Sequence, residues 1–521
     1  MTIRFCPTSL SLLLLVLLTA CSSSPTQPVR APVEETDLTP VTDTVESEQI
    51  DPQTGFWKEP SERSLADVMT LSRSMPTYQP AVALEVVRSL ESIRSSDLKT
   101  MIESQLYDPE FTEWLELALQ LRTVMIDGSP VAGAGQYWQD YHYGHPVTRA
   151  EFIALASDYK SHFPAPSRVA VLLPDEGGLA AAAMAIRDGI LRAYLDNPGN
   201  SALRFYSSGT NSESAMAAYI QARDEGADQI IGPLRLESTQ AISELDDLSV
   251  PVLLLNRTDH EQPGTDGHTD LVTSMSLSQA DEAASIAKNA LAHDQSRAIV
   301  IVPDSAWGKR IEDAFITPFI QNGGQVSASA EYERSTSDHS TMLTKLLKID
   351  ESRQRKVRLQ TQIGAPLTFE PSRRDDFDFI FMAASPQEGR ELKPLLRFHD
   401  AGEVPVYSIG RIYSGLRETS RDQDLNGIVF TAVNWQLDKA NAERPLPGSV
   451  RDGAFGRLYA LGQDAWRLLP WLPLMKKDTD LWYSGEIGKL KIEAGGQIYR
   501  QPAWAQFSGG QPTPYQWPHH F

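Results

Sequence analysis

The chain has very little cysteine and no long hydrophobic run. Its 521 residues include only Cys6 and Cys21. The longest apolar run, Leu10–Leu18, is interrupted only by Ser11 and has about nine residues, whereas a membrane-spanning helix needs about 20. A mature chain without paired thiols must rest on a hydrophobic core, and a 41% hydrophobic composition allows one. The length favours two or three domains.

The apolar run has the layout of a secretory signal. Arg4 supplies a positive start, Leu10–Leu18 the apolar centre, and Thr19–Ala20 the small residues before a cleavage site. The stretch is also similar to the bacterial lipobox, which implies cleavage before Cys21 and lipid attached to it. Two or more acyl chains anchor a protein firmly, whereas one gives marginal binding. We therefore interpret residues 1–20 as a lipoprotein signal peptide; an ordinary secreted protein with a free Cys21 is the alternative.

The segment after Cys21 is rich in Pro, Ser, Thr and Glu and has almost no large apolar residues. Such a segment cannot bury enough surface to offset its ordering entropy. We interpret residues 21–59 as a lipidated Cys21 and a disordered tether that would reach roughly 125 Å when extended. The residue directly after Cys21 is Ser22 rather than Asp. In the enteric-type sorting rules for lipoproteins, this resembles a signal for the outer membrane. The predicted location is therefore the outer membrane, with the body facing the periplasm.

Basic residues are outnumbered by acidic ones, with 47 Lys and Arg against 68 Asp and Glu. The formal net charge is −21 and the sequence pI is about 4.9. Nucleic-acid binding needs a basic footprint, so no nucleic-acid partner is predicted. One basic stretch stands out, "SRQRKVRLQ", with Arg353, Arg355, Lys356 and Arg358. It is either a solvated helix face or a docking patch for an acidic partner.

The residue pattern changes near position 166. From 60 to 166 apolar residues recur at helical spacing, and Thr148 with Glu151 has the pattern of a capping box. From 167 to 521 strand-like runs alternate with helical ones, as in "RVAVLLP" and "RAIVIVPD". This alternation predicts parallel doubly wound sheets in two lobes, divided near residue 270 and sharing a cleft.

Three glycines of the second region stand where a predicted helix ends and a strand begins. They are Gly226, Gly324 and Gly402. Because glycine adopts the left-handed conformation without steric cost, it is common directly after the end of a helix. We expect all three at that position.

Catalytic motifs are missing from the sequence. It contains no H-E-x-x-H, G-x-S-x-G or P-loop pattern, and no G-x-G-x-x-G after a strand. The 10 histidines are scattered, and neither the pair His142 and His145 nor the pair His519 and His520 has an acidic or Cys partner at ligand spacing, so no metal site or cofactor is predicted. Asp375, Asp376 and Asp378 precede a predicted strand, opposite the edge where α/β sites form. A solvated loop, or pairing with Arg373 and Arg374, is favoured over catalysis there, and no enzymatic activity is predicted.

Several stretches from Arg168 to the C-terminus carry a family resemblance. They include "GADQIIGPL", "ELKPLLRFHDAGEVPVYS", "GKLKIEAGGQIYRQPAWAQF" and, most specifically, "FEPSRRDDFDFIF" at Phe369–Phe381. These stretches resemble the LppC/LpoA family, lipoprotein activators of penicillin-binding proteins. The resemblance implies a tetratricopeptide-like helical domain followed by a type I periplasmic-binding-protein fold. It also implies an outer-membrane lipoprotein that stimulates a class A (bifunctional) peptidoglycan synthase. The helical region is shorter here than in the best-known members.

The predicted fold class is therefore α/β, a bilobal periplasmic-binding-protein-like domain preceded by a small all-α domain. The predicted parts are a signal peptide at 1–20, a lipidated tether at 21–59, a helical domain at 60–166 and the bilobal domain at 167–521.

A lipid-anchored solute receptor of the leucine-binding type is the alternative function, since it shares the bilobal fold. Such receptors have a Gly-x-x-x-Ser run after the third strand, and the Ser holds the carboxylate of the ligand. Here the run is Gly232 to Leu236, and a Leu side chain cannot donate a hydrogen bond. Ser238 or Thr239 could replace that Ser if the loop shifts. Leu236, Ser238 and Thr239 are therefore the candidate cleft residues.

Overall fold

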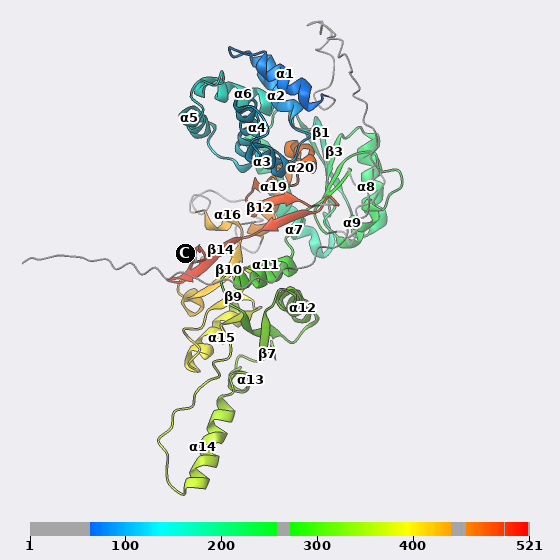
Figure 1. Ribbon diagram of the computed structural model, residues 1–521. Helices are drawn as coiled ribbons and strands as arrows, with labels where there is room; N and C mark the ends of the chain where they lie inside the picture. The colour runs from blue at the N-terminus through cyan, green and yellow to red at the C-terminus, as the bar shows by residue number, and fades with distance from the viewer. Residues whose placement is uncertain (1–62, 258–270, 439–449, 451–454, 494, 519–521) are drawn as a thin grey trace, which may run out of the picture. The chain divides into compact units, whose positions relative to one another are not determined.

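The computed structural model describes residues 63–257, 271–438, 450, 455–493 and 495–518 (Figure 1). All of them belong to one unit, which spans Lys58–Phe521. None of the helices in these ranges combines the length and the hydrophobicity that a membrane crossing requires. The predicted signal peptide, Cys21 and the predicted tether lie outside the described residues.

The first described region is helical. Its helices are α1 (Leu65–Arg73), α2 (Pro80–Ser89), α3 (Ser95–Glu103), α4 (Pro109–Asp127), α5 (Val131–Tyr141) and α6 (Arg149–Ser161). The capping box predicted for α6 is confirmed, because the backbone N–H of Thr148 donates to Glu151 Oε2 at 3.1 Å. The core of the region is built around α4, which buries Phe111, Trp114 and Leu121.

The first sheet is parallel, with the strand order β2-β1-β3-β4-β5. Its strands and their helices are β1 (Arg168–Leu173), α7 (Ala180–Asp196), β2 (Ala202–Ser207), α8 (Ser212–Asp224), β3 (Gln229–Ile231), α9 (Leu236–Ser243), β4 (Val252–Leu254) and β5 (Val272–Ser274). Val169 and Val171 face one hydrophobic core, while Ala170 and Leu172 face another on the opposite side. Burial on both faces explains why β1 is a continuous apolar run.

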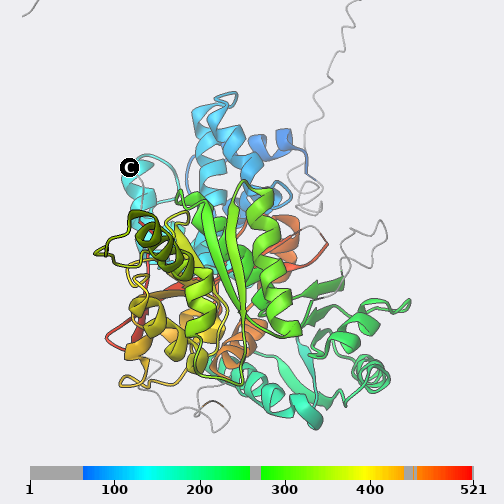
Figure 2. The same ribbon diagram turned by 90° about the horizontal axis from the view of Figure 1, so that it is seen from below.

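The second sheet has the order β15-β14-β10-β9-β8-β6-β7 and combines parallel strands with an antiparallel edge. Its strands are β6 (Arg297–Pro303), β7 (Gln325–Tyr332), β8 (Phe379–Met382), β9 (Val406–Ser408), β10 (Ile428–Ala432), β14 (Ala503–Ser508) and β15 (Gln511–Pro514). The helices α11 (Gln279–Ala292) and α12 (Ala306–Gln321) cover one face, and α13 (Ser340–Leu346) and α15 (Pro386–Phe398) cover the other (Figure 2). The predicted α/β class with a helical N-terminal part is confirmed.

After β10 the chain returns to the first lobe. There α19 (Gly456–Arg467) packs against α7, followed by α20 (Leu472–Lys477) and a small sheet of β11 (Tyr483–Ser484), β12 (Lys489–Ile492) and β13 (Ile498–Gln501). Glycines set the spacing of α7 and α19. A Cβ on Gly189 would lie 2.0 Å from the carbonyl oxygen of Tyr459, and one on Gly462 would lie 2.1 Å from that of Ile186. The two helices can approach this closely only because both positions lack a side chain.

The glycine predictions are confirmed at one position and wrong at two. Gly226 is left-handed, with φ 84°, directly after α8. After α12 and α15, however, the left-handed residues are Gly323 and Asp400, rather than Gly324 and Gly402. Gly324 instead makes room for a neighbour, since a Cβ there would lie 2.6 Å from the ring of Phe319.

Candidate functional site

A buried ion network centred on Glu282 of α11 joins the two lobes. One oxygen of its carboxylate pairs with Arg457 on α19 and with Arg500 on β13. The other accepts from the backbone N–H of Gly410 at 2.9 Å and from the hydroxyl of Thr431 at 3.0 Å. Groups from both lobes therefore meet on one carboxylate, close to where the chain passes from β5 into α11.

This network is stable with Glu282 charged. Burial alone would raise the pKa of Glu282, but Arg457, Arg500 and the two hydrogen-bond donors lower it below its usual value. The network was not predicted from the sequence. Glu282 does lie on the face of α11 that buries Ala283 and Ile286, and a glutamate on an apolar face is a usable signal. Its arginine partners, 175 and 218 positions away, could not be inferred from local pattern.

The four basic residues singled out in the sequence lie on an arm formed by residues 349–373, hereafter the α14 arm. It consists of α14 (Ile349–Ile363) and the segment that returns along the helix to β8. Figure 1 shows α14 standing away from the strands of the second sheet. Within the helix only Ile349 and Ser352 are buried. At the base of the arm the backbone N–H of Arg374 donates to the carbonyl of Leu347 at 2.9 Å, so its two ends are joined.

The basic residues do not form one patch. With 3.6 residues per turn, positions two apart lie on nearly opposite sides of a helix, while positions three or four apart are neighbours. Arg353 therefore groups with Lys356, and Arg355 groups with Arg358. Arg353 pairs with Asp350 at 3.4 Å, and the Lys356 ammonium lies 5.6 Å from the centre of the Phe369 ring. These two cations interact within the arm.

The other pair lies on a more open face. Arg355 and Arg358 are exposed and form no ion pair within the described ranges. Leu359 lies one helical turn after Arg355, and Ile363 lies one turn after Leu359; the two apolar side chains are 47% and 59% exposed. We call Arg355, Arg358, Leu359 and Ile363 the α14 docking face. It combines free guanidinium groups with exposed apolar surface, a composition typical of protein interfaces.

The candidate cleft residues lie at the start of α9. Leu236 is 46% exposed, whereas Ser238 and Thr239 are buried. The hydroxyl of Thr239 donates to the carbonyl of Leu236 at 2.7 Å. The structure thus does not bring these three side chains to a common surface, and the Thr239 hydroxyl is already used inside the first lobe.

Two of the three acidic residues before β8 are held by arginines. Arg374 pairs with Asp376 at 2.5 Å, and Arg297 pairs with Asp378 at 2.6 Å. Asp378 also accepts from the backbone N–H groups of Ser296 and Arg297, at 3.0 and 2.9 Å. These contacts confirm the predicted pairing for Asp376, and they show that Asp378 fixes the start of β6 against the start of β8.

A family model described as "LppC putative lipoprotein" matches residues 87–510, which is more than half of the chain. The chain belongs to the LppC family. Within this family, a relative from Vibrio antiquarius named "Penicillin-binding protein activator LpoA" is 24% identical over 419 residues, 78% of this chain and 68% of that protein. A relative of the same name from Vibrio vulnificus is 27% identical over 413 residues, which cover 75% of this chain and 66% of that protein. The LppC chain described here thus spans about two thirds of the length of these relatives.

Solved structures share the fold of this LppC-family chain. The C-domain of LpoA from Haemophilus influenzae has a TM-score of 0.53 at 20% identity, covering 67% of this chain and 100% of that domain. A monoclinic form of H. influenzae LpoA also has a TM-score of 0.53, at 19% identity, covering 86% of this chain and 84% of that one. A chain from Chromobacterium violaceum, described as a "putative branched-chain amino acid ABC transporter", reaches 0.50 at 22% identity and covers 66% of this chain and 100% of that one. The fold is thus a bilobal type I periplasmic-binding-protein-like domain preceded by helices.

Proposed function

We propose that this chain is a non-enzymatic outer-membrane lipoprotein that binds and activates a class A penicillin-binding protein in peptidoglycan synthesis. The observation that carries the proposal is the family match over residues 87–510. Relatives that align with three quarters or more of the chain are named as penicillin-binding protein activators, and the H. influenzae C-domain is described as "a regulator of PBP1A".

The anchor in this proposal is Cys21. Acyl chains on Cys21 hold the protein at the outer membrane, and residues 22–59 carry the body into the periplasm. Two or more acyl chains give the stable attachment that such a position requires. A chain held by one end can meet a synthase whose own body stands in the periplasm.

Activation in this proposal occurs through contact. A bound activator shifts the equilibrium of its partner only if it binds the active state more tightly than the inactive one. The α14 docking face supplies a suitable contact, because Arg355 and Arg358 can bind carboxylates while Leu359 and Ile363 bury apolar area. The partner surface is accordingly acidic, with an apolar centre. The Glu282 network holds the lobes together while the arm engages that surface.

The test is a glycan-polymerisation assay with a purified class A synthase, with and without residues 60–521 of this chain. We expect the polymerisation rate to rise when the chain is present. We also expect binding to weaken as salt increases, since salt screens the arginine charges of the docking face. The proposal is abandoned if neither stimulation nor binding is found at low salt.

A further inference from the structure

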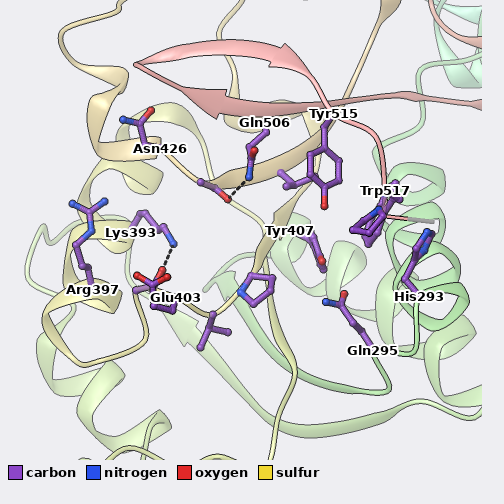
Figure 3. A pocket seen from close by; sticks show the side chains of 16 residues that line it. His293, Gln295, Lys393, Arg397, Glu403, Tyr407, Asn426, Gln506, Tyr515 and Trp517 are labelled. Atoms are coloured by element: carbon purple, nitrogen blue, oxygen red, sulfur yellow. Dashed lines mark hydrogen bonds between the residues drawn. The ribbon is translucent and has the colours of Figure 1, made fainter. Parts of the chain in front are cut away.

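The second lobe contains a cavity of about 550 Å³ at the amino ends of its strands (Figure 3). Pro405 immediately precedes β9, Gly427 immediately precedes β10, and both line the cavity. The rest of the wall comes from α15, the connection between α11 and β6, β14 and the C-terminal segment after β15. Parallel α/β sheets usually bind ligands at the carboxyl ends of their strands. This cavity is at the opposite edge and does not include the candidate cleft residues of α9.

A buried ammonium group lies at one end of the cavity. Lys393 on α15 is only 3% exposed, and its Nζ donates to the carbonyl of Gly402 at 3.3 Å, a long hydrogen bond. In the described ranges it forms no ion pair. Burial and the nearby Arg397 lower the pKa of Lys393, while the exposed Glu403 acts in the opposite direction. A lysine in this position has N–H donors left for an anionic ligand.

The other end of the cavity is aromatic. Figure 3 shows Tyr407, Tyr515 and Trp517 across the cavity from Lys393 and Glu403. The rings of Tyr407 and Trp517 have centroids 4.8 Å apart. Trp517 is 9% exposed, and its Nε1–H has no hydrogen-bond partner among the described residues. The Oε1 atom of Gln295, also on the wall, is likewise buried without a partner there.

We propose that this cavity binds a small monocarboxylate that carries an aromatic or other planar apolar group. The carboxylate lies at the Lys393 end, where Arg397 adds a second positive charge. The planar group lies against Tyr407 and Trp517, and a polar substituent can accept the free indole N–H. A doubly charged phosphate fits less well, because Glu403 stands at the cationic end and repels extra negative charge. This site is independent of the proposed activation of a synthase.

The test is calorimetric titration of the full mature chain, in mild detergent, with N-acetylphenylalanine and with its amide. The two probes differ at a single group, a carboxylate in one and an uncharged carboxamide in the other. We expect the acid to bind in the millimolar range and at least about tenfold more tightly than the amide. Lys393→Met should abolish this difference. Lys288→Met, at an exposed position of α11 outside the cavity wall, is the matched control and should preserve it.

Thermal unfolding shows whether Lys393→Met folds. If it does not, a second variant tests the proposal. Trp517→Phe retains an aromatic ring but removes the indole N–H. It should lower the affinity for N-acetylphenylalanine several-fold. The proposal is overturned by equal affinities for acid and amide, or by the absence of binding at about 10 mM acid. It is also overturned if phenyl phosphate binds more tightly than the acid, or if neither cavity variant changes the affinity.

Discussion

Arg122 on α4 and Asp478, directly after α20, form an ion pair 3.1 Å long in which neither side chain has any exposed surface. Arg122 also donates to the backbone carbonyls of Ile93, at 2.6 Å, and Leu90. Asp478 accepts from the backbone N–H and the hydroxyl of Ser95, at 3.1 and 2.6 Å. The helical region is thereby fixed to the first lobe by groups that are fully withdrawn from water.

Asp478→Ala should destabilise this junction by about 3–5 kcal/mol, because it leaves the Arg122 charge buried without a counter-ion. Denaturant unfolding, monitored by hydrogen exchange of the α3 and α4 amides, measures the loss of unfolding free energy. Asp97→Ala is the control, since it removes the exposed Arg94–Asp97 pair, and it should leave stability nearly unchanged. Equal effects of the two substitutions would show that the buried pair does not hold the junction.

Asp464 of α19 predicts a distinctive pH dependence. It is fully buried and accepts from the backbone N–H groups of Glu486 and Ile487, both at 2.8 Å. Burial raises the pKa of Asp464 from 3.8 to about 7. Between these two values the folded chain holds a proton that the unfolded chain has released. The contribution of Asp464 to the unfolding free energy therefore falls as pH rises through this window, and it is constant above it.

Asp464→Asn should remove this contribution. Urea unfolding at a series of pH values, for the native chain and the variant, gives the two slopes. We expect the native chain to lose stability relative to Asp464→Asn as the pH rises from about 4 to about 7. Parallel slopes for the two proteins would contradict the assignment.

Reversing the charges of the α14 docking face should weaken activation of the synthase. With Arg355→Glu and Arg358→Glu together, we expect about tenfold weaker association and a corresponding loss of stimulation at subsaturating concentration. Arg353→Glu is the control on the same helix, because that residue already pairs with Asp350. Stimulation that survives the double reversal would leave the activator proposal intact and exclude this face.

Acylation of Cys21 can be read from the mass of the mature N-terminus. We expect the mature chain to begin at Cys21 and to carry acyl chains. Cys21→Ala should release the protein from the membrane, and the circular dichroism and melting temperature of the body should not change. An unmodified Cys21, or cleavage at another bond, would remove the proposed anchor.

Free amino acids should not bind tightly to this chain. Leu236 provides no hydrogen-bond donor, and the Thr239 hydroxyl is occupied by the Leu236 carbonyl. A calorimetric screen of amino acids and muropeptides is expected to give no micromolar ligand. A micromolar hit would favour the solute-receptor alternative.

The strands that are continuous apolar runs could be predicted from the sequence. "RVAVLLP" and "RAIVIVPD" coincide with β1 and β6 almost residue for residue. The return of the chain to the first lobe after β10 was not predicted, because it depends on contacts between distant segments such as Gly189 with Tyr459. The distribution of the basic residues around α14 can be predicted from the sequence, because helical spacing alone places Arg353 and Arg355 on nearly opposite sides of the helix.

The hydrogen bond between Arg374 and Leu347 has a consequence for how this protein can change over evolutionary time. Because the α14 arm leaves and rejoins the lobe at one point, the strands on either side keep their register whatever lies between. Lengthening a surface excursion costs little entropy, about 0.6 kcal/mol for each doubling of a flexible loop. The arm can therefore change in length and in sequence as a partner diverges, while the fold of the lobe that carries it stays the same.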